Sequence, residues 1–342
     1  MMIKLGIFCG GRSDEHEVSV LSAGSVIEAI NKAKYEIAVV YITRDGYWYA
    51  TKQLDCPISQ LPESGEPVQP SFKPGQSGLL TLDQGEFWPL DVVFPLLHGP
   101  YGEDGRLQGL LDWCNLPYIG SDVAASALGM NKHLSKIIFA QNRLPQVDYL
   151  VGSSNAADLV AKSEEQIGYP CIVKPVNLGS SIGINRANER EELVQAIQTA
   201  QKFSGQVIIE KFILAREIEC AVMGNERPEA SSLGEIVHGS AFYDYETKYS
   251  DNSAQLIVDA ALPPESKEEI QKMALAAYQA LGCKGLARVD FFYEEKGNKI
   301  YINEINTLPG LTKYSMYPKL WEHKGVNYSE LIDRLVELAL NR

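Results

Sequence analysis

The sequence predicts an α/β protein, α+β in parts, that contains two or three domains and begins with a parallel sheet. Three observations lead to this prediction. The chain has 342 residues, which is more than one ordinary domain contains. A strand, a glycine turn, a helix and a second strand follow one another near the N-terminus, and this order forms a βαβ unit with parallel strands. Strands and helices then continue to alternate as far as the C-terminus.

The first domain is predicted to end near residue 122. Its apolar strand at 3–9 is followed by two glycines and by a helix at 13–33, in which apolar residues recur at helical spacing. A second strand is predicted at 35–43. Residues 55–85 are polar and rich in proline, glycine and serine, so a loop or irregular connection is expected there.

The rest of the chain divides into two further segments. A buried strand at 91–99 still belongs to the first domain. The second segment, 123–215, is predicted as a small α+β unit with a helix at 122–144, strands at 169–176 and 182–187, a helix at 188–203 and a strand at 206–213. The third segment, 216–342, is predicted to contain strands at 217–224, 286–293 and 299–306 and long helices at 264–282 and 328–341.

The composition argues against several classes of function. Lys and Arg number 31 against 44 Asp and Glu, a net charge of −13, and no basic tract is present, so nucleic acid is not an expected partner. No stretch approaches the roughly 20 apolar residues of a membrane span, and the apolar N-terminal run is too short for a signal peptide. The six cysteines lie far apart without a C-x-x-C pair, as in a cytoplasmic protein with reduced thiols.

A candidate metal site lies in the segment GLARVDFFYEEKGNKIYINEIN, which predicts a β-hairpin with its turn near Gly297. Pairing outward from this turn places Asp290 opposite Glu304 to within about one residue, with Arg288 on the face of Asp290 and Asn306 on the face of Glu304. Carboxylate and amide oxygens are ligands that suit Mg²⁺ better than zinc. The alternative is a solvent-facing polar sheet surface with cross-strand charge pairs, and the spacing alone leaves it open.

A lysine at the end of an apolar strand marks a second candidate site. Lys174 is followed by the small residues of NLGSSIG (177–183), which is not a Walker motif but can expose several backbone N–H groups to a phosphate. An ordinary hairpin turn is the alternative. The lysine favours the phosphate site, because burying its charge is costly unless it meets an anion.

Two loops follow strands of the first domain, where open α/β sheets bind ligands. Glu15 lies in one of them, and His98 precedes the other. The acids near Glu15 could instead form a capping box, Asp14 with Glu17, or simply favour the helix N-terminus. A single histidine such as His98 is more often structural, so both readings stay open.

Two further segments carry weaker signals. Residues 242–250, FYDYETKYS, are too polar for a core and too aromatic for a plain loop, and they are predicted to form a lid that excludes water from a ligand. The apolar strand VIIEKFI leads into Glu210 and Lys211, which predicts a hinge between domains. The alternatives are an exposed strand and an ordinary strand end.

Taken together, these segments resemble the D-alanine–D-alanine ligases of the ATP-grasp superfamily. The resemblance covers residues 3 to 340 and rests on eight motifs in order: GGRSDEHEVS, LLHGPYGEDG, MNK, VKPVNLGSSIG, IIEKFI, FYDYETKY, ARVDFF and NEINTLPG. It implies three domains, 1–122, 123–215 and 216–342, with ATP between the second and third. It also implies ligation of two D-alanines through a D-alanyl phosphate, for peptidoglycan precursors and hence for cell wall and cell shape.

The resemblance assigns nucleotide and metal roles to matching positions. Lys132 and Lys174 would hold the phosphates, under the loop that contains Ser181. The remaining nucleotide contacts would come from the adenine hinge, the ribose site and the lid, at Glu210, Lys211, Ile213, Glu217 and Lys248. Two Mg²⁺ ions, or Mn²⁺, would be held by Asp290, Glu304 and Asn306.

The first D-alanine would be bound through its ammonium group by Glu15. By the same resemblance, Ser180 and Tyr249 would be linked to Glu15, and His98 would lie nearby. Relatives that join D-alanine to D-lactate usually lack the tyrosine matched here by Tyr249, so its presence favours a dipeptide product.

The reacting carboxyl would be polarised by Arg288 and the backbone N–H of Gly310. Ser315 and Met316 would hold the carboxylate of the second D-alanine. The resemblance further suggests a homodimer.

Two positions depart from the family pattern. Asn131 stands where Asp is usual, and Tyr314 precedes Ser315 where a different residue is common. Neither has a named role, so fine substrate preference is the property they put in question.

The competing predictions are another carboxylate–amine ligase, such as a D-Ala-D-Ser or D-Ala-D-lactate ligase, and an ATP-binding regulator without turnover. Retention of Arg288 and of the three metal ligands argues against the regulator. A nicotinamide-dependent dehydrogenase is discounted because GGRSDE does not fit G-x-G-x-x-G.

Overall fold

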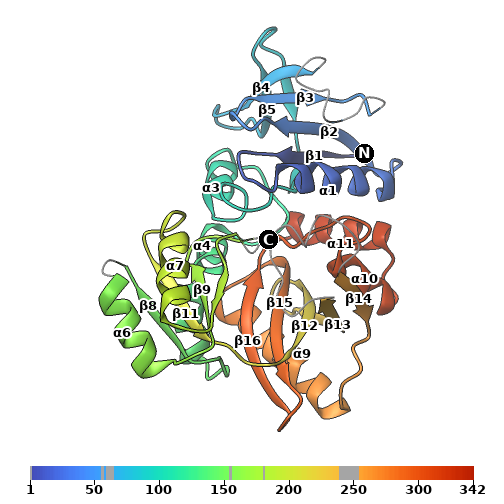
Figure 1. The fold of residues 1–342 in the computed structure, drawn as a ribbon. Coiled ribbons are helices and arrows are strands. Elements are labelled where there is room, and N and C mark those ends of the chain that lie inside the picture. The colour runs from blue at the N-terminus through green and yellow to red at the C-terminus, as the bar shows by residue number, and fades with distance from the viewer. Residues whose placement is uncertain (1, 55–57, 59–64, 154–155, 180–181, 239–253) are drawn as a thin grey trace.

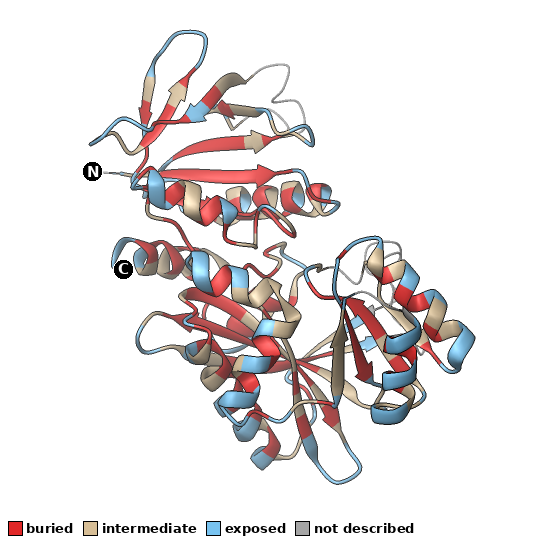
Figure 2. Ribbon diagram, turned by 90° about the vertical axis from the view of Figure 1, so that its left-hand side faces the viewer, coloured by how far each residue is buried: buried red, intermediate tan, exposed pale blue. Residues whose placement is uncertain are grey.

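Three sheets organise the computed structural model, which describes residues 2–342 except 55–57, 59–64, 154–155, 180–181 and 239–253. The first sheet lies at the top of Figure 1, the second at the lower left and the third at the lower right. Buried residues are concentrated in the strands and on the inward faces of the helices (Figure 2). The sheets fall within the three segments predicted above, and the domain limits themselves stay a prediction.

The first sheet has seven strands in the order β6-β5-β4-β3-β2-β1-β7. Its strands are β1 (Ile3–Gly10), β2 (Tyr35–Ile42), β3 (Trp48–Thr51), β4 (Glu66–Pro70), β5 (Gly78–Thr81), β6 (Phe87–Pro89) and β7 (Val92–Pro95). β1 pairs in parallel with β2 and with β7, which confirms the predicted βαβ unit. Helices α1 (His16–Ala29) and α3 (Arg106–Trp113) pack on opposite faces of this parallel part.

The expectation of an irregular connection over 55–85 is wrong where β4 and β5 lie. These short strands pair antiparallel with each other, and Val68 and Leu79 are buried with Trp88 in one core cluster. Proline and glycine lie at strand ends, as Pro70 does in β4 and Gly78 in β5. Each strand buries only one or two apolar side chains, so a segment that is polar overall can still contain two strands.

The second sheet is antiparallel, in the order β10-β9-β11-β8. Its elements are α4 (Val123–Met130), α5 (Lys132–Gln141), β8 (Tyr149–Gly152), α6 (Ala156–Gln166), β9 (Cys171–Pro175), β10 (Asn185–Ala187), α7 (Arg190–Gln201) and β11 (Val207–Lys211). The single helix predicted at 122–144 is two helices, because the backbone of Asn131 is extended between them. The Asn131 side chain accepts a hydrogen bond from the N–H of Leu134 and so caps α5.

The third sheet has the order β14-β13-β12-β15-β16. Its strands are β12 (Arg216–Gly224), β13 (Glu229–His238), β14 (Ala254–Val258), β15 (Gly285–Glu294) and β16 (Lys299–Asn306), and its helices are α9 (Pro264–Ala280), α10 (Met316–His323) and α11 (Tyr328–Leu340). Successive residues of β12 point to opposite faces. Cys220 packs in the core formed with α9, and Ala221 packs in the core formed with α10 and α11.

One hydrophobic core joins the first and third sheets. It contains Ile7 and Val26 from the N-terminal part together with Trp321 and Leu335 from α10 and α11. Asp333 of α11 accepts hydrogen bonds from Lys34 and from the hydroxyl of Tyr35 at the start of β2. The second sheet instead has a core cluster of its own. The first and third sheets therefore form one packed body, to which the second sheet is attached.

This shared core leads to a stability prediction. Leu335→Ala is expected to lower the free energy of unfolding by about 2–5 kcal/mol, because it removes a fully buried side chain and leaves a cavity between the two sheets. Urea unfolding of the variant measures this loss. Leu340→Ala is the matched control on the same helix, where the leucine is exposed, and it is expected to change little. Equal stability of both variants would contradict the shared core.

Candidate active site

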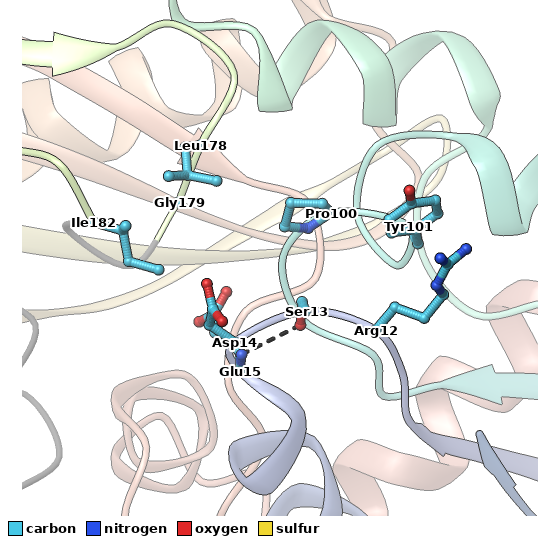
Figure 3. A pocket seen from close by; sticks show the side chains of 9 residues that line it. All are labelled: Arg12, Ser13, Asp14, Glu15, Pro100, Tyr101, Leu178, Gly179 and Ile182. Carbon is cyan, nitrogen blue, oxygen red and sulfur yellow. Dashed lines mark hydrogen bonds between the residues drawn. The ribbon is translucent and has the colours of Figure 1, made fainter. Parts of the chain in front are cut away.

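Three loops from two sheets enclose a cavity of about 220 Å³. The loops follow β1, β7 and β9, and the residues that line the cavity are Arg12, Ser13, Asp14, Glu15, Pro100, Tyr101, Leu178, Gly179 and Ile182. Figure 3 shows Arg12 and Tyr101 at one end and the carboxylates of Asp14 and Glu15 toward the other, near Gly179 and Ile182. The cavity thus lies at the carboxyl ends of β1 and β7, as predicted for a ligand site in an open α/β sheet.

Glu15 provides a carboxylate to this cavity. Glu15, and not Asp14, is the N-cap residue of α1, so the capping box suggested for Asp14 and Glu17 is wrong; the Glu15 side chain makes no capping hydrogen bond. A Cβ atom at Gly99 would lie 2.8 Å from Oε2 of Glu15, and one at Gly179 would lie 3.9 Å from it. Gly99 also has φ +71°, so glycine there allows both the turn and the close approach of the carboxylate.

His98 is buried beside this carboxylate. Its Nε2 lies 3.1 Å from Oγ of Ser22, and its Nδ1 lies 3.4 Å from Oε1 of Glu103. Burial lowers the pKa of His98, but the hydrogen bond and charge of Glu103, with the charge of Glu15, outweigh it and hold the pKa above its usual value. Burial also raises the pKa of Glu103. His98 therefore sits in a hydrogen-bonded network behind the cavity wall.

The predicted hairpin is confirmed, and the pairing of Asp290 with Glu304 agrees with the prediction; a one-residue register shift follows between Asp290 and Phe291. Asp290 pairs with Glu304 and Arg288 with Asn306 on β15 and β16, and the chain turns at Gly297. Nε and Nη2 of Arg288 each donate to an Asp290 oxygen at 2.7 Å. Nδ2 of Asn306 donates to Oδ2 of Asp290 at 2.9 Å. The four polar side chains therefore do share one face.

Arg288 has a second carboxylate partner that the sequence analysis missed. Oε1 of Glu219 lies 3.1 Å from its Nε, and Glu219 is buried on β12 directly opposite Asp290. Burial lowers the pKa of Arg288, but Asp290 and Glu219 raise it well above its usual value, so the guanidinium stays charged. Glu219 could have been found from the sequence, because it lies two residues after Glu217 and so shares one face of the strand with it.

The donor set on this hairpin fits a hard divalent cation. Asp290 and Glu304 supply carboxylate oxygens from paired positions, and Asn306 supplies an amide from the next position on that face. Among the described residues, no three His, Cys, Asp or Glu side chains form a metal-binding group. The set here differs because its third member is an amide.

Lys132 connects the hairpin to the loop after β9. Its Nζ donates to the carbonyl of Leu178 at 2.7 Å and lies 3.4 Å from Oε2 of Glu304. A second, smaller cavity of about 20 Å³ adjoins these groups, and Gly179 lines both cavities. The lysine, the loop and the hairpin face therefore belong to one site.

The charge of Lys174 is paired inside the protein with a carboxylate, and its predicted role toward a phosphate stays a prediction. Its Nζ lies 2.7 Å from Oε2 of Glu210, and the Nζ of Lys136 lies 2.8 Å from Oε1 of the same carboxylate. Burial would raise the pKa of Glu210, but the two lysines together lower it to about 2. Lys136 was missed in the sequence. Its spacing of four from Lys132 puts both lysines on one side of α5 and was the signal available.

The other predicted nucleotide contacts differ in orientation. Lys211 follows Glu210 on β11, so its side chain points the opposite way and is exposed, 3.9 Å from Asp148. Ile213 and Glu217 are half-buried. Only the backbone of Lys211 can therefore line a nucleotide pocket on the Glu210 side.

Gly310, predicted at the reacting carboxyl, lies after β16 with Ser315 and Met316, predicted at the second substrate. Oγ of Ser315 would be 3.0 Å from a Cβ atom at Gly310, and Ser315 is the N-cap residue of α10 without capping the helix itself. The Met316 side chain is buried in the shared core. Met316 can therefore contribute only its backbone N–H to a ligand at this helix N-terminus.

Some predictions cannot be placed. Ser180, Ser181, Lys248 and Tyr249 lie outside the described residues, as does the predicted lid at 242–250. The five described cysteines, all but Cys56, are free and buried, as expected for reduced thiols. No helix within the described ranges is long and apolar enough to cross a membrane.

Comparison with known families decides between the competing predictions. A family model described as the D-ala D-ala ligase N-terminus matches residues 4–121, and one described as the D-ala D-ala ligase C-terminus matches residues 138–337. The chain belongs to the D-alanine–D-alanine ligase family. Membership confirms the resemblance and implies the use of ATP, a divalent metal ion and small-molecule substrates.

Curated relatives extend this family match over nearly the whole chain. The D-alanine–D-alanine ligase of Thermoanaerobacter sp. (strain X514) is 47% identical over 345 residues, which are 98% of this chain and 96% of the relative. That of Geobacillus thermodenitrificans (strain NG80-2) is 44% identical over 355 residues, 100% of this chain and 96% of the relative.

Solved structures of ligases share the fold. The D-alanine–D-alanine ligase from Coxiella burnetii has a TM-score of 0.90 at 35% identity, covering 100% of this chain and 94% of the other. The VanG D-Ala:D-Ser ligase from Enterococcus faecalis has a TM-score of 0.89 at 34% identity, covering 99% and 100%. The predicted ATP-grasp architecture is confirmed, and ligases with different second substrates share it.

Proposed function

We propose that this chain joins two D-alanine molecules to D-alanyl-D-alanine and converts ATP to ADP and phosphate. The observation that carries the proposal is that Gly179 lines two neighbouring cavities, each with its own set of charged groups. The Glu15 cavity lies on one side of the loop around Gly179, and Lys132 with the face of Asp290, Glu304 and Asn306 lies on the other. The Glu15 cavity is complementary to the ammonium group of an amino acid. Lys132 and the hairpin face are complementary to a metal-bound polyphosphate.

The reaction needs ATP because a carboxylate is a poor electrophile. An oxygen of the first D-alanine's carboxylate attacks the γ-phosphorus of ATP, and ADP leaves. The resulting D-alanyl phosphate is attacked by the amine of the second D-alanine, and phosphate leaves as the peptide bond forms. Positioning and charge neutralisation contribute nearly all of the catalysis of such a phosphoryl transfer.

The phosphates of ATP bind Lys132 and Lys174, which now pair with Glu304 and Glu210. Asp290, Glu304 and Asn306 are assigned to hold two Mg²⁺ ions, or Mn²⁺, which would neutralise phosphate charge. The other nucleotide contacts are assigned to the loop, the adenine hinge, the ribose site and the lid, at Ser181, Lys211, Ile213, Glu217 and Lys248.

Glu15 pairs with the ammonium of the first D-alanine, and His98 supports the cavity wall behind it. The always-charged guanidinium of Arg288 and the N–H of Gly310 stabilise the negative charge that develops on the carboxyl oxygen. These assignments follow from the family and are supported by the position of Glu15 and the charge of Arg288.

The second D-alanine's carboxylate is assigned to the hydroxyl of Ser315 and the N–H of Met316, at the N-terminus of α10. A helix N-terminus favours an anion, which supports this assignment. Ser180 and Tyr249, which lie outside the described residues, are assigned to the first D-alanine by the family resemblance alone. The role in peptidoglycan precursor synthesis, the cytoplasmic location and the homodimer belong to the same proposal.

Phosphate release tests the proposed function. The protein is incubated with ATP and Mg²⁺ and with D-alanine, L-alanine, D-serine, or D-alanine plus D-lactate, and products are identified by mass. Release with D-alanine alone and a D-alanyl-D-alanine product are expected. The resemblance to VanG makes a D-alanyl-D-serine product the second candidate, but the more similar curated relatives are D-alanine–D-alanine ligases. ATP binding without release for any of these amino acids would reject the ligase.

Glu304→Gln tests the metal assignment. It is expected to raise the Mg²⁺ concentration for half-maximal activity by at least about 10-fold, since even residues that only support a metal ligand typically contribute that much. Glu294→Gln is the matched control, because Glu294 lies at the turn end of the same hairpin and pairs with Lys299. An unchanged Mg²⁺ titration for Glu304→Gln would return the hairpin face to a purely structural role.

A further inference from the structure

A buried triad of charges lies beside the proposed phosphate site. It consists of Lys136 on α5, Glu210 on β11 and Lys174 on β9, and its side chains are 2%, 4% and 9% exposed. The two oxygens of Glu210 are divided between the lysines, at 2.8 Å from Lys136 and 2.7 Å from Lys174. The carboxylate therefore has two counter-charges, although one would neutralise it.

The two lysines face different surroundings. Nζ of Lys174 lies 3.4 Å from Oδ1 of Asn303, the neighbour of Glu304 on β16, so this lysine borders the hairpin. Nζ of Lys136 lies on the other side of Glu210, 5.2 Å from the centre of the Tyr149 ring on β8. In the sheet order β9-β11-β8, Glu210 stands between these positions. Lys174 can turn toward a ligand at the hairpin, whereas Lys136 is enclosed.

Moving Lys174 to a phosphate has an energetic consequence for Glu210. Breaking a buried ion pair by removing one partner is strongly destabilising, because the remaining charge is left uncompensated. Lys136 avoids this cost, since it stays on the carboxylate when Lys174 leaves. Building on the proposed function, we infer that Lys136 is a positioning residue: it remains the counter-charge of Glu210 and so releases Lys174 to bind the nucleotide phosphates.

Comparing a nucleoside with a nucleotide tests this role directly. Binding of adenosine and of ADP with Mg²⁺ is measured by calorimetry for the wild type and for Lys136→Met. Methionine fills the space of the lysine stem and leaves the pair of Glu210 and Lys174 intact. ADP affinity is expected to fall at least about 10-fold, equivalent to about 1.4 kcal/mol, while adenosine affinity stays unchanged. A residue that merely shaped the adenine pocket would affect both ligands equally, and that result would overturn the inference.

A second variant keeps the inference falsifiable if Lys136→Met does not fold. In Lys136→Met with Glu210→Gln, the neutral amide needs no counter-charge, so Lys174 is free again. The ratio of ADP affinity to adenosine affinity should return close to that of the wild type. A double variant that folds but still loses the phosphate-dependent gain would overturn the inference. Lys136→Arg, which keeps the charge, should retain the wild-type ratio.

These binding measurements are independent of turnover. A wild-type protein that binds ADP but forms no dipeptide would reject the proposed ligation and leave the role of Lys136 to be decided by the variants. Absence of ADP binding by the wild type would overturn both. Lys267→Met, which removes an exposed pair with Asp259, serves as a control and should change neither affinity.

Discussion

Arg288→Ala is expected to reduce kcat by at least about 10²–10³-fold, or about 2.7–4 kcal/mol, the usual effect of losing one stabiliser of a developing oxyanion. Arg288 is held in place by two bonds to Asp290 and by Glu219, and its pKa lies well above the usual value, so its charge is present at every working pH. Steady-state turnover of ATP with D-alanine measures the loss.

Two further variants separate catalysis from folding. Arg288→Lys keeps a positive charge beside Asp290 and Glu219 but loses the paired donors of the guanidinium, so an intermediate kcat is expected. Arg334→Ala removes an exposed arginine that pairs with Glu330 on α11 and should leave kcat unchanged. Near-normal turnover by folded Arg288→Ala would contradict the role assigned to the guanidinium.

Glu15→Gln is expected to lower kcat/KM for the first D-alanine by at least about 30-fold, since losing one partner of a desolvated charge pair typically costs 2–5 kcal/mol. The neutral amide keeps the shape of the side chain in the cavity but cannot neutralise an ammonium group. The KM for ATP should not change, because Glu15 lies on the cavity side of the Gly179 loop.

Asp14→Asn is the matched control for Glu15→Gln. Asp14 precedes Glu15, lines the same cavity and is more exposed, so loss of its charge should have little effect on kcat/KM. If the two variants lost activity equally, the cavity would act through its overall negative charge, and Glu15 would have no specific role.

The hairpin register could be predicted from the sequence to within about one residue because a local turn largely sets it. Gly297 and Asn298 both have positive φ values, and a turn at Gly297 brings Asp290 close to Glu304; a one-residue register shift between Asp290 and Phe291 then makes Glu304 the partner of Asp290. The face proposed to hold metal ions is therefore formed by residues that are close in sequence. The βαβ unit of β1, α1 and β2 could be predicted for the same reason, because its elements follow one another in the sequence.

Other features depend on contacts that are distant in sequence. Lys136 reaches Glu210 only because α5 packs against β11. Glu219 reaches Arg288 only because β12 pairs with β15. β4 and β5 were missed because their stability comes from burying Val68 and Leu79 against Trp88, which the local composition does not reveal. Tertiary packing decides such cases over local propensity.

The central claim is that the first D-alanine is activated as an acyl phosphate at this site. The most direct test uses D-alanine labelled with ¹⁸O in its carboxylate, with ATP and Mg²⁺, and mass analysis of the released phosphate. The account predicts one ¹⁸O atom in each phosphate, because the carboxylate oxygen that attacks the γ-phosphorus leaves with it. Unlabelled phosphate would mean that water, and not D-alanine, attacks ATP, and would contradict the account.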